Sequence, residues 1–214
     1  MTGGAPLTPF SQRLKGNVAR LDAAYRASME DATAHLRRSG MAGGAKTTGD
    51  RAPDFALPHG RGAPFVLSDA LAAGPVVLSF LRGEWCSFCR IEMDALVDAR
   101  SRIAARGARL VMISPQAPSA AFAARTCGLA GLTVLTDRLN GVALQYGLVF
   151  RMPDMLRHAL LDLDVDLGHI YGTDAWLVPI PATYLLAPDG TIALAHIDPD
   201  TCVRLDPEEI VARI

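Results

Sequence analysis

Two cysteines separated by two residues, Cys86 and Cys89, are the residues whose type and spacing most clearly suggest chemistry. They follow the apolar segment 76–79 and precede apolar residues spaced as one face of an amphipathic helix. We therefore expect both sulfurs on the first turn of a helix that follows a buried strand. Unpaired backbone N–H groups and the helix dipole stabilise a thiolate there. A thiolate attacks disulfides and peroxides, so the pattern indicates thiol redox chemistry.

Composition and charge limit the partners that this chain is expected to have. The 214 residues are 50% hydrophobic and 20% charged, with a formal net charge of -1, which is an ordinary globular balance. This charge gives no overall field that would attract nucleic acid or an anionic membrane. Residues 1–10 lack the pattern of an export signal, and no apolar run approaches the ~20 residues of a membrane span. We expect a soluble cytoplasmic protein with no nucleic-acid or membrane partner.

The cysteine count indicates a catalytic pair rather than a structural one. Four cysteines in a chain of 214 residues are too few for a disulfide scaffold. A structural zinc site needs four ligands, but Cys127 and Cys202 are single and distant, and the histidines form no ligand-spaced cluster. Nothing in the sequence suggests a haem, nucleotide or flavin. We expect no metal and no cofactor.

The first part of the chain is predicted to be a helical arm, residues 1–45. Residues 9–38 form the pattern of one long amphipathic helix, which the glycines from Gly40 onward end. A helix that is apolar on one side must bury that side. The arm is therefore expected to dock on the following domain or on a second subunit, which makes a homodimer possible.

Residues 46–214 are predicted to form one α/β domain. Two continuous apolar runs, at about 75–81 and 109–114, flank the helix that starts at the cysteine pair and ends at about 105. Strand, helix and strand in this order predict a right-handed parallel crossover. The alternation continues with a helix at about 117–127, a strand at 133–135 and a helix at about 138–146.

The C-terminal part predicts an antiparallel hairpin and a final helix. Strands at 182–186 and 191–197 flank an Asp-Gly turn, and a helix starts at about Pro207. Residues 151–178 are interpreted as an insertion, with a possible helix at 153–163 and a polar loop around 168–174. A parallel βαβ half joined to an antiparallel hairpin and a terminal helix is the thioredoxin fold, a central mixed sheet flanked by helices.

From about Gly49 to its end, the chain resembles the peroxiredoxin superfamily, also called AhpC/TSA, and in particular its thioredoxin-like bacterial branch with a Trp-Cys-x-x-Cys motif. The resemblance is carried by segments 49–55, 82–89, 113–116 and 179–184. It implies an antioxidant oxidoreductase that reduces hydroperoxides. It also implies electrons from a separate donor, either a thioredoxin-like protein or a low-molecular-weight thiol.

The resemblance also suggests roles for individual residues. Peroxiredoxins resemble one another in a Pro-x-x-x-Thr-x-x-Cys loop, which places Cys89 at the peroxide-attacking position, Cys86 at the threonine and Arg82 at the proline. Two of these three positions depart from the family pattern. Trp85 is expected to cover the thiols, and Arg82 or Arg90 to supply a positive charge beside them.

A further departure lies in the segment that contains Pro181 and Thr183. Peroxiredoxins have an arginine at the position of Pro181, whereas thioredoxins have a cis-proline there. The segment is more similar to the thioredoxin form, so we expect a cis peptide bond before Pro181, beside the sulfurs. This departure removes a cation from the expected site.

Two enzymatic mechanisms and one non-enzymatic function remain open from the sequence. In a peroxidase, Cys89 attacks a hydroperoxide and Cys86 closes the disulfide. In a thioredoxin-like disulfide reductase, Cys86 attacks a disulfide and Cys89 resolves it. Position on the helix favours Cys86 as the nucleophile, because the more inward thiol is partly buried. The third possibility is an interaction protein switched by the same disulfide.

Overall fold

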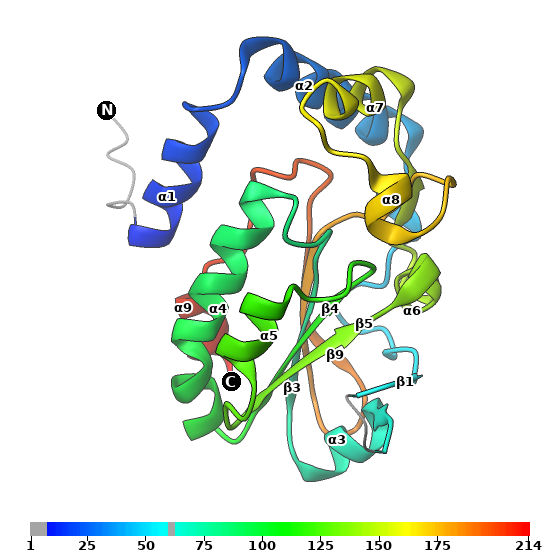
Figure 1. Ribbon diagram of the computed structural model, residues 1–214. Coiled ribbons are helices and arrows are strands. Elements are labelled where there is room, and N and C mark those ends of the chain that lie inside the picture. The colour runs from blue at the N-terminus through cyan, green and yellow to red at the C-terminus, as the bar shows by residue number, and fades with distance from the viewer. Residues whose placement is uncertain (1–7, 60–62) are drawn as a thin grey trace, which may run out of the picture.

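The computed structural model describes residues 8–59 and 63–214, built around a mixed sheet of five strands (Figure 1). The strand order is β5-β4-β3-β8-β9. β3 runs parallel to β4, and β4 to β5, whereas β8 is antiparallel to both β3 and β9. The bounds are β3 Val76–Phe80, β4 Arg109–Ser114, β5 Leu132–Thr136, β8 Ala182–Leu186 and β9 Ile192–Ile197. The predicted α/β thioredoxin fold is confirmed.

Four helices lie on one side of this sheet (Figure 1). α4, Ser87–Ala105, is the crossover helix between β3 and β4, and α1, Pro9–Val18, and α9, Pro207–Arg213, both pack against it. α5, Ala120–Thr126, connects β4 to β5. The crossover brings the start of α4 to the C-terminal end of β3. None of the described helices is long and apolar enough to cross a membrane.

The opposite face of the sheet buries an aromatic cluster. Phe80, Tyr146 and Tyr184 have ring centroids 5.0 to 6.1 Å apart. Side chains alternate along a strand, so Ser79 points to the other face, toward α4. Short elements flank this side: β1 Ala56–Leu57 paired with β2 Phe65–Val66, α3 Leu67–Ala73, a 3₁₀ turn Arg138–Asn140 and α6 Gly141–Gln145.

The predicted single helix over 9–38 is wrong, because the arm consists of two helices. α1 ends at Val18, and α2 spans Ala23–Ser39, followed by a 3₁₀ turn Met41–Gly44. The Asp22 carboxylate accepts hydrogen bonds from the backbone N–H groups of Ala24 and Tyr25, which starts a new helix in a new direction. Gly40, at φ 67°, ends α2 as expected.

The segment predicted as an insertion is more ordered than its sequence suggested. β6 Val149–Arg151 and β7 Leu177–Pro179 form an antiparallel pair, with α7 Asp154–Leu161 and α8 Leu167–Tyr171 between them. The prediction of a loop around 168–174 is wrong for residues 168–171, which are helical. The Asp166 carboxylate accepts the N–H of Gly168 at the start of α8, and Gly172, at φ 71°, ends this helix. α2 packs against α7, so this segment supports the arm.

Gly147 offers a test of how the end of the arm docks on the domain. Gly147 has φ +70°, and a Cβ added there would overlap the Gly44 carbonyl and lie 2.9 Å from the Cα of Ala45. Gly172 has φ +71° with open space around the corresponding position. We expect Gly147→Ala to lose at least about 2 kcal/mol more stability than Gly172→Ala, measured by urea unfolding. Equal losses would show that the contact with residues 44–45 contributes nothing.

Candidate active site

The two cysteines lie at the start of α4, as predicted, with unequal burial. Cys86 is the residue before the helix and is 6% exposed, whereas Cys89, in the first turn, is 0% exposed. No acidic residue lies in the first turn of α4, so no carboxylate offsets the positive end of the helix dipole. All four cysteines are free thiols. The pair is therefore in its dithiol form, with Cys86 nearer to solvent.

The two cysteines differ in how readily each loses a proton. Hydrogen bonding to Cys89 lowers the pKa of Cys86 to about 5; burial opposes this shift, and the guanidinium groups of Arg82 and Arg204 add to it. Burial, and then hydrogen bonding to Cys86, raises the pKa of Cys89 well above its ordinary value. These shifts favour the thiolate at Cys86 and the thiol at Cys89.

The backbone before the cysteines is held from two sides. The Arg82 carbonyl accepts hydrogen bonds from the Trp85 indole N–H at 3.0 Å and from the Tyr171 hydroxyl at 2.6 Å. On the other side, Gln116 Oε1 accepts the backbone N–H of Glu84 at 2.8 Å. A Cβ at Gly83 would overlap the Gln116 side chain, and its φ of +122° also favours glycine. Trp85 therefore braces the loop.

A buried ion pair lies beneath Cys89. Arg204 forms an ion pair with Glu92, and their side chains are 2% and 3% exposed. Arg204 Nη2 is 3.6 Å from Cys89 Sγ, and the Arg82 backbone N–H donates to the same sulfur at 3.4 Å. Burial raises the pKa of Glu92 and the Arg204 cation opposes that shift. Arg204 supplies a fixed positive charge at the inner thiol.

Two strand residues hold the carboxylate of this pair. Ser79 on β3 and Thr183 on β8 face each other in the sheet, and both hydroxyls donate to Glu92 Oε1 at 3.2 Å. Thr183, a predicted site residue, therefore acts on the sulfurs through Glu92 and Arg204. A buried carboxylate with three partners is stable in position.

Arg82, another predicted site residue, is buried beside the outer sulfur. It is 4% exposed, its guanidinium carbon lies 5.8 Å from the centroid of the Phe150 ring, and its Nε has no hydrogen-bond partner among the described residues. Its cation lowers the pKa of Cys86 after the larger effects of Cys89 and burial. The expectation that Arg82 places positive charge near the thiols agrees with this position, whereas Arg90 is exposed on α4.

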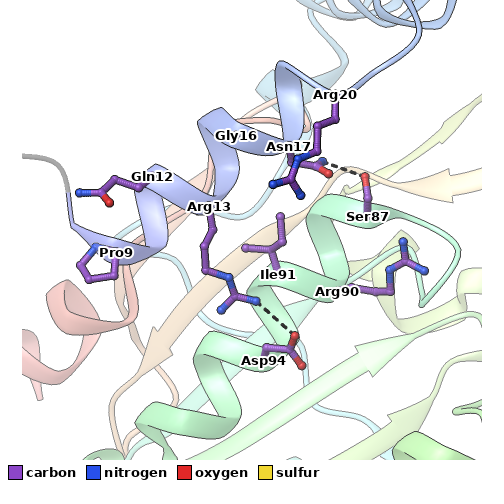
Figure 2. Close-up of a pocket in the computed structure, with 10 residues that line it drawn as sticks. All are labelled: Pro9, Gln12, Arg13, Gly16, Asn17, Arg20, Ser87, Arg90, Ile91 and Asp94. Carbon is purple, nitrogen blue, oxygen red and sulfur yellow. Dashed lines mark hydrogen bonds and ion pairs between the residues drawn. The ribbon is translucent and has the colours of Figure 1, made fainter.

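The N-terminal arm covers the outer cysteine. Asn17 on α1 donates to the Ser87 hydroxyl at 2.8 Å, directly after Cys86 in the chain (Figure 2). Tyr25 on α2 is half-buried; burial, and next the charge on Cys86, raises the pKa of Tyr25 to about 12. Asn17 therefore fixes α1 at the first turn of α4, and Tyr25 on α2 lies within electrostatic range of Cys86.

The expected cis bond before Pro181 is not present, because none of the described peptide bonds is cis. The segment joins β7, which ends at Pro179, directly to β8, which starts at Ala182, and the trans isomer is the lower-energy form of an X–Pro bond. Pro181 is buried, and its neighbour Ala182 pairs with Phe80. Pro181 is therefore level with the strand end that leads into the cysteine loop.

The remaining cysteines and acidic groups form no second site near the pair. Cys127 is exposed after α5, and burial, with Asp200 beside it, raises the pKa of Cys202 to about 12. The Glu84 carboxylate accepts hydrogen bonds from Ser119 at the start of α5. No cluster of three or more potential metal ligands occurs in residues 8–59 and 63–214.

Sequence reasoning missed three residues of the site: Arg204, Glu92 and Tyr171. Arg204 is 115 positions from Cys89 in an irregular segment, and Tyr171 lies in the part interpreted as an insertion. Their side chains meet the cysteines only through the packing of the chain. One local signal existed for Glu92, since a charged residue interrupts the apolar face of α4 one position before Met93.

The buried pair gives a double-mutant test. Arg204→Met leaves the Glu92 carboxylate buried without a cation and should lower the free energy of unfolding by about 3 kcal/mol. The double variant Arg204→Met/Glu92→Leu should have a free energy of unfolding closer to that of wild type. The loss in the single variant should be smaller at low pH, because protonation of Glu92 removes the uncompensated charge. Urea unfolding measures both effects.

Arg102→Met is the matched control. Arg102 forms an ion pair with Glu208, and the two side chains are 51% and 61% exposed, so this substitution should lower the free energy of unfolding by less than about 1 kcal/mol. Additive losses in the double variant, or a loss independent of pH, would contradict a coupled buried pair.

Solved structures of peroxiredoxins and of a thiol peroxidase share this fold. The chain is similar to the peroxidoxin BcpB of Mycobacterium tuberculosis, with 24% identity, a TM-score of 0.57 and coverage of 78% of this chain and 95% of that one. It is also similar to a Plasmodium vivax 2-Cys peroxiredoxin, with 18% identity, a TM-score of 0.55 and coverage of 78% and 79%. A thiol peroxidase from Chromobacterium violaceum gives 17% identity, a TM-score of 0.53 and coverage of 78% and 84%. No curated protein matches the chain significantly.

A model of the AhpC/TSA family matches residues 48–195, which is most of the chain and contains the strand, loop and helix that carry the cysteines. The match agrees with the mixed sheet and with the position of the thiols at the start of the crossover helix. The chain belongs to the AhpC/TSA family of peroxiredoxin-like thiol oxidoreductases.

Proposed function

We propose that this enzyme reduces hydroperoxides with Cys86 as the attacking thiolate and Cys89 as the resolving thiol. The observation that carries this proposal is the position of Cys86 directly before the first turn of α4, where it is less buried than Cys89. Hydrogen bonding to Cys89 and the charges of Arg82 and Arg204 lower the pKa of Cys86 to about 5. The attacking group must be ionised and must meet the substrate, and Cys86 satisfies both conditions better than the fully buried Cys89. The two motif cysteines thus exchange the roles that the family loop suggests.

The chemical steps use the two thiols, the substrate and one proton from solvent. The Cys86 thiolate attacks the outer oxygen of ROOH, the O–O bond breaks, and Cys86 becomes a sulfenic acid while RO⁻ takes a proton from solvent as ROH. The Cys89 sulfur then attacks the Cys86 sulfur. The S–O bond breaks, and the hydroxyl leaves with the Cys89 proton as water. Arg204, 3.6 Å from Cys89 Sγ, and the Arg82 N–H stabilise the developing thiolate in this step.

The covered position of Cys86 supports a small substrate over a protein disulfide. In thiol–disulfide exchange, the attacking sulfur must lie in line with the S–S bond that breaks. When that bond belongs to a partner protein, the surface around the attacking sulfur must be open. Here Cys86 is 6% exposed, and Asn17 from the arm binds the next residue, Ser87. A thioredoxin-like disulfide reductase uses the same two thiols and is the alternative that the experiments below separate.

Several expectations accompany this proposal. We propose that residues 1–45 act as an arm over residues 46–214, and that the enzyme works in the cytoplasm, where a thioredoxin-like protein or a small thiol regenerates the dithiol. The arm helices pack on helices of their own chain, so the mechanism needs no second subunit. A homodimer stays a prediction.

Serine variants test the order of the two thiols. We expect Cys86→Ser to abolish the reaction with hydrogen peroxide, because the nucleophile is lost. Cys89→Ser should still consume one equivalent in a single turnover and stop at the sulfenic acid. Stopped-flow peroxide consumption and mass spectrometry of the product measure these outcomes, with Cys127→Ser as the matched control.

If Cys89→Ser abolishes the single turnover and Cys86→Ser retains it, the roles are reversed. If wild type reduces a protein disulfide rapidly and hydrogen peroxide slowly, the disulfide reductase is the correct function. A single stoichiometric oxidation without sustained turnover, in the presence of dithiothreitol, would indicate a redox switch.

The pH dependence of thiolate formation tests the electrostatics. In a Cys127→Ser/Cys202→Ser background, the ultraviolet absorbance of thiolate should rise with a midpoint near pH 5, the pKa of Cys86. Cys89→Ala should move this midpoint upward toward that of an ordinary thiol, about 8.5, because the main cause of the low pKa is removed. Arg82→Met should move it upward by less. An unchanged midpoint in Cys89→Ala would contradict the role of the hydrogen bond.

A further inference from the structure

A polar groove lies between the arm and the helix that carries the cysteines. It runs between α1 and the first turns of α4, from Pro9 to Ser87, and encloses about 710 Å³ (Figure 2). This volume is within the range of small-ligand sites. The proposed peroxide chemistry does not use the groove, because hydrogen peroxide is far smaller than this space.

The groove carries an excess of positive charge. Arg13, Arg20 and Arg90 line it, with Asp94 as the acidic residue of the lining. Asp94 is already engaged, since it pairs with Arg13 at 3.2 Å and with Arg125 at 2.7 Å. Among the described residues, neither Arg20 nor Arg90 forms an ion pair. Two guanidinium groups are therefore free to bind carboxylates.

These two arginines lie at the end of the groove where Ser87 lines it. Figure 2 shows Arg20 on α1, and Ser87 and Arg90 on α4, at that end. Ser87 is the residue after Cys86, and the Arg90 backbone N–H donates to the Cys86 carbonyl at 3.0 Å. Arg90 is thus one helical turn from the attacking cysteine.

The groove has room at its wall on α1. Gly16 lines it, and a Cβ built at this position would have no heavy atom within 4 Å. A side chain there would project into open space. The position can therefore be used to fill the groove without disturbing the packing of the arm.

From these observations we propose that the groove binds the reductant, a small thiol that carries carboxylates, and directs its sulfur past Ser87 to Cys86. The proposal rests on the proposed peroxidase cycle, in which the Cys86–Cys89 disulfide must be reduced in every turnover. The electropositive lining selects an anionic thiol over a neutral one.

The reduction balances with two molecules of this thiol. The first, as thiolate RS⁻, attacks Cys86; the Cys86–Cys89 bond breaks, and Cys89 leaves as a thiolate, beside Arg204, and takes a proton. The second thiolate attacks the thiol-derived sulfur of the mixed disulfide. The products are RSSR and the Cys86 thiolate, so two electrons pass from two thiols to the protein disulfide.

Glutathione and its diethyl ester are the probes, because they share a thiol and a backbone but differ in carboxylate charge. Peroxide turnover is measured with each, and with dithiothreitol, in wild type and in Arg20→Gln/Arg90→Gln. We expect kcat/KM for glutathione to fall about fivefold in the double variant and also at high salt, with little change for the ester or dithiothreitol. Arg106→Gln, at the far end of α4, is the matched control and should change nothing.

Filling the groove gives an independent test without a change of charge. Gly16→Leu should reduce glutathione-supported turnover at least as strongly, and by more than Gly16→Ala, whose side chain fills less of the groove; Arg106→Gln is again the control. Binding of S-methylglutathione, measured by calorimetry, should weaken in both the arginine variant and Gly16→Leu.

Two outcomes would overturn this inference alone: a glutathione-supported rate that is unaffected by the arginine and leucine variants, or no preference for glutathione over its ester in wild type. If the wild-type enzyme does not turn over peroxide when dithiothreitol is the reductant, the proposed function is overturned, and this inference with it.

Discussion

The chemistry of this protein depends on the unequal burial of two sulfurs at the start of α4. Cys86 lies directly before the helix, whereas Cys89 is fully buried in its first turn. Burial therefore raises the pKa of Cys89, while hydrogen bonding to Cys89 lowers the pKa of Cys86. A symmetrical pair of exposed thiols would have no preferred nucleophile.

Keeping a charged sulfur at a buried site requires compensating cations, and these require support of their own. Arg204 lies beneath Cys89, and its buried charge is balanced by Glu92. Glu92 in turn is held by hydroxyls on β3 and β8. The central sheet thus positions the thiols indirectly, through a chain of polar contacts from strand to carboxylate to guanidinium to sulfur. Because Arg204, Glu92 and the two hydroxyls each have a partner, the cost of burying this ion pair is offset.

The N-terminal arm links access to the site with the proposed binding groove for the reductant. Its two helices place Tyr25 and Asn17 near the cysteines and leave a groove lined by arginines along α4. A small peroxide needs only a narrow path to Cys86, whereas a reductant needs a binding surface. The same arm that shields Cys86 from large partners would therefore select the molecule that regenerates it.

The α/β fold and the place of the cysteine pair could be predicted from the amino-acid sequence, because strand and helix periodicity and an Asp-Gly turn are local signals. The order of the two thiols could not, because position on the helix favours Cys86 as the nucleophile whereas the family resemblance favours Cys89. Only the tertiary structure showed the break between α1 and α2, the trans bond before Pro181, and the cation at Cys89. Arg204 reaches that sulfur from 115 positions away, and no pattern of neighbouring residues encodes such a contact. Periodicity reports which face of an element is buried, but the partners of a buried charge are decided by how the elements pack.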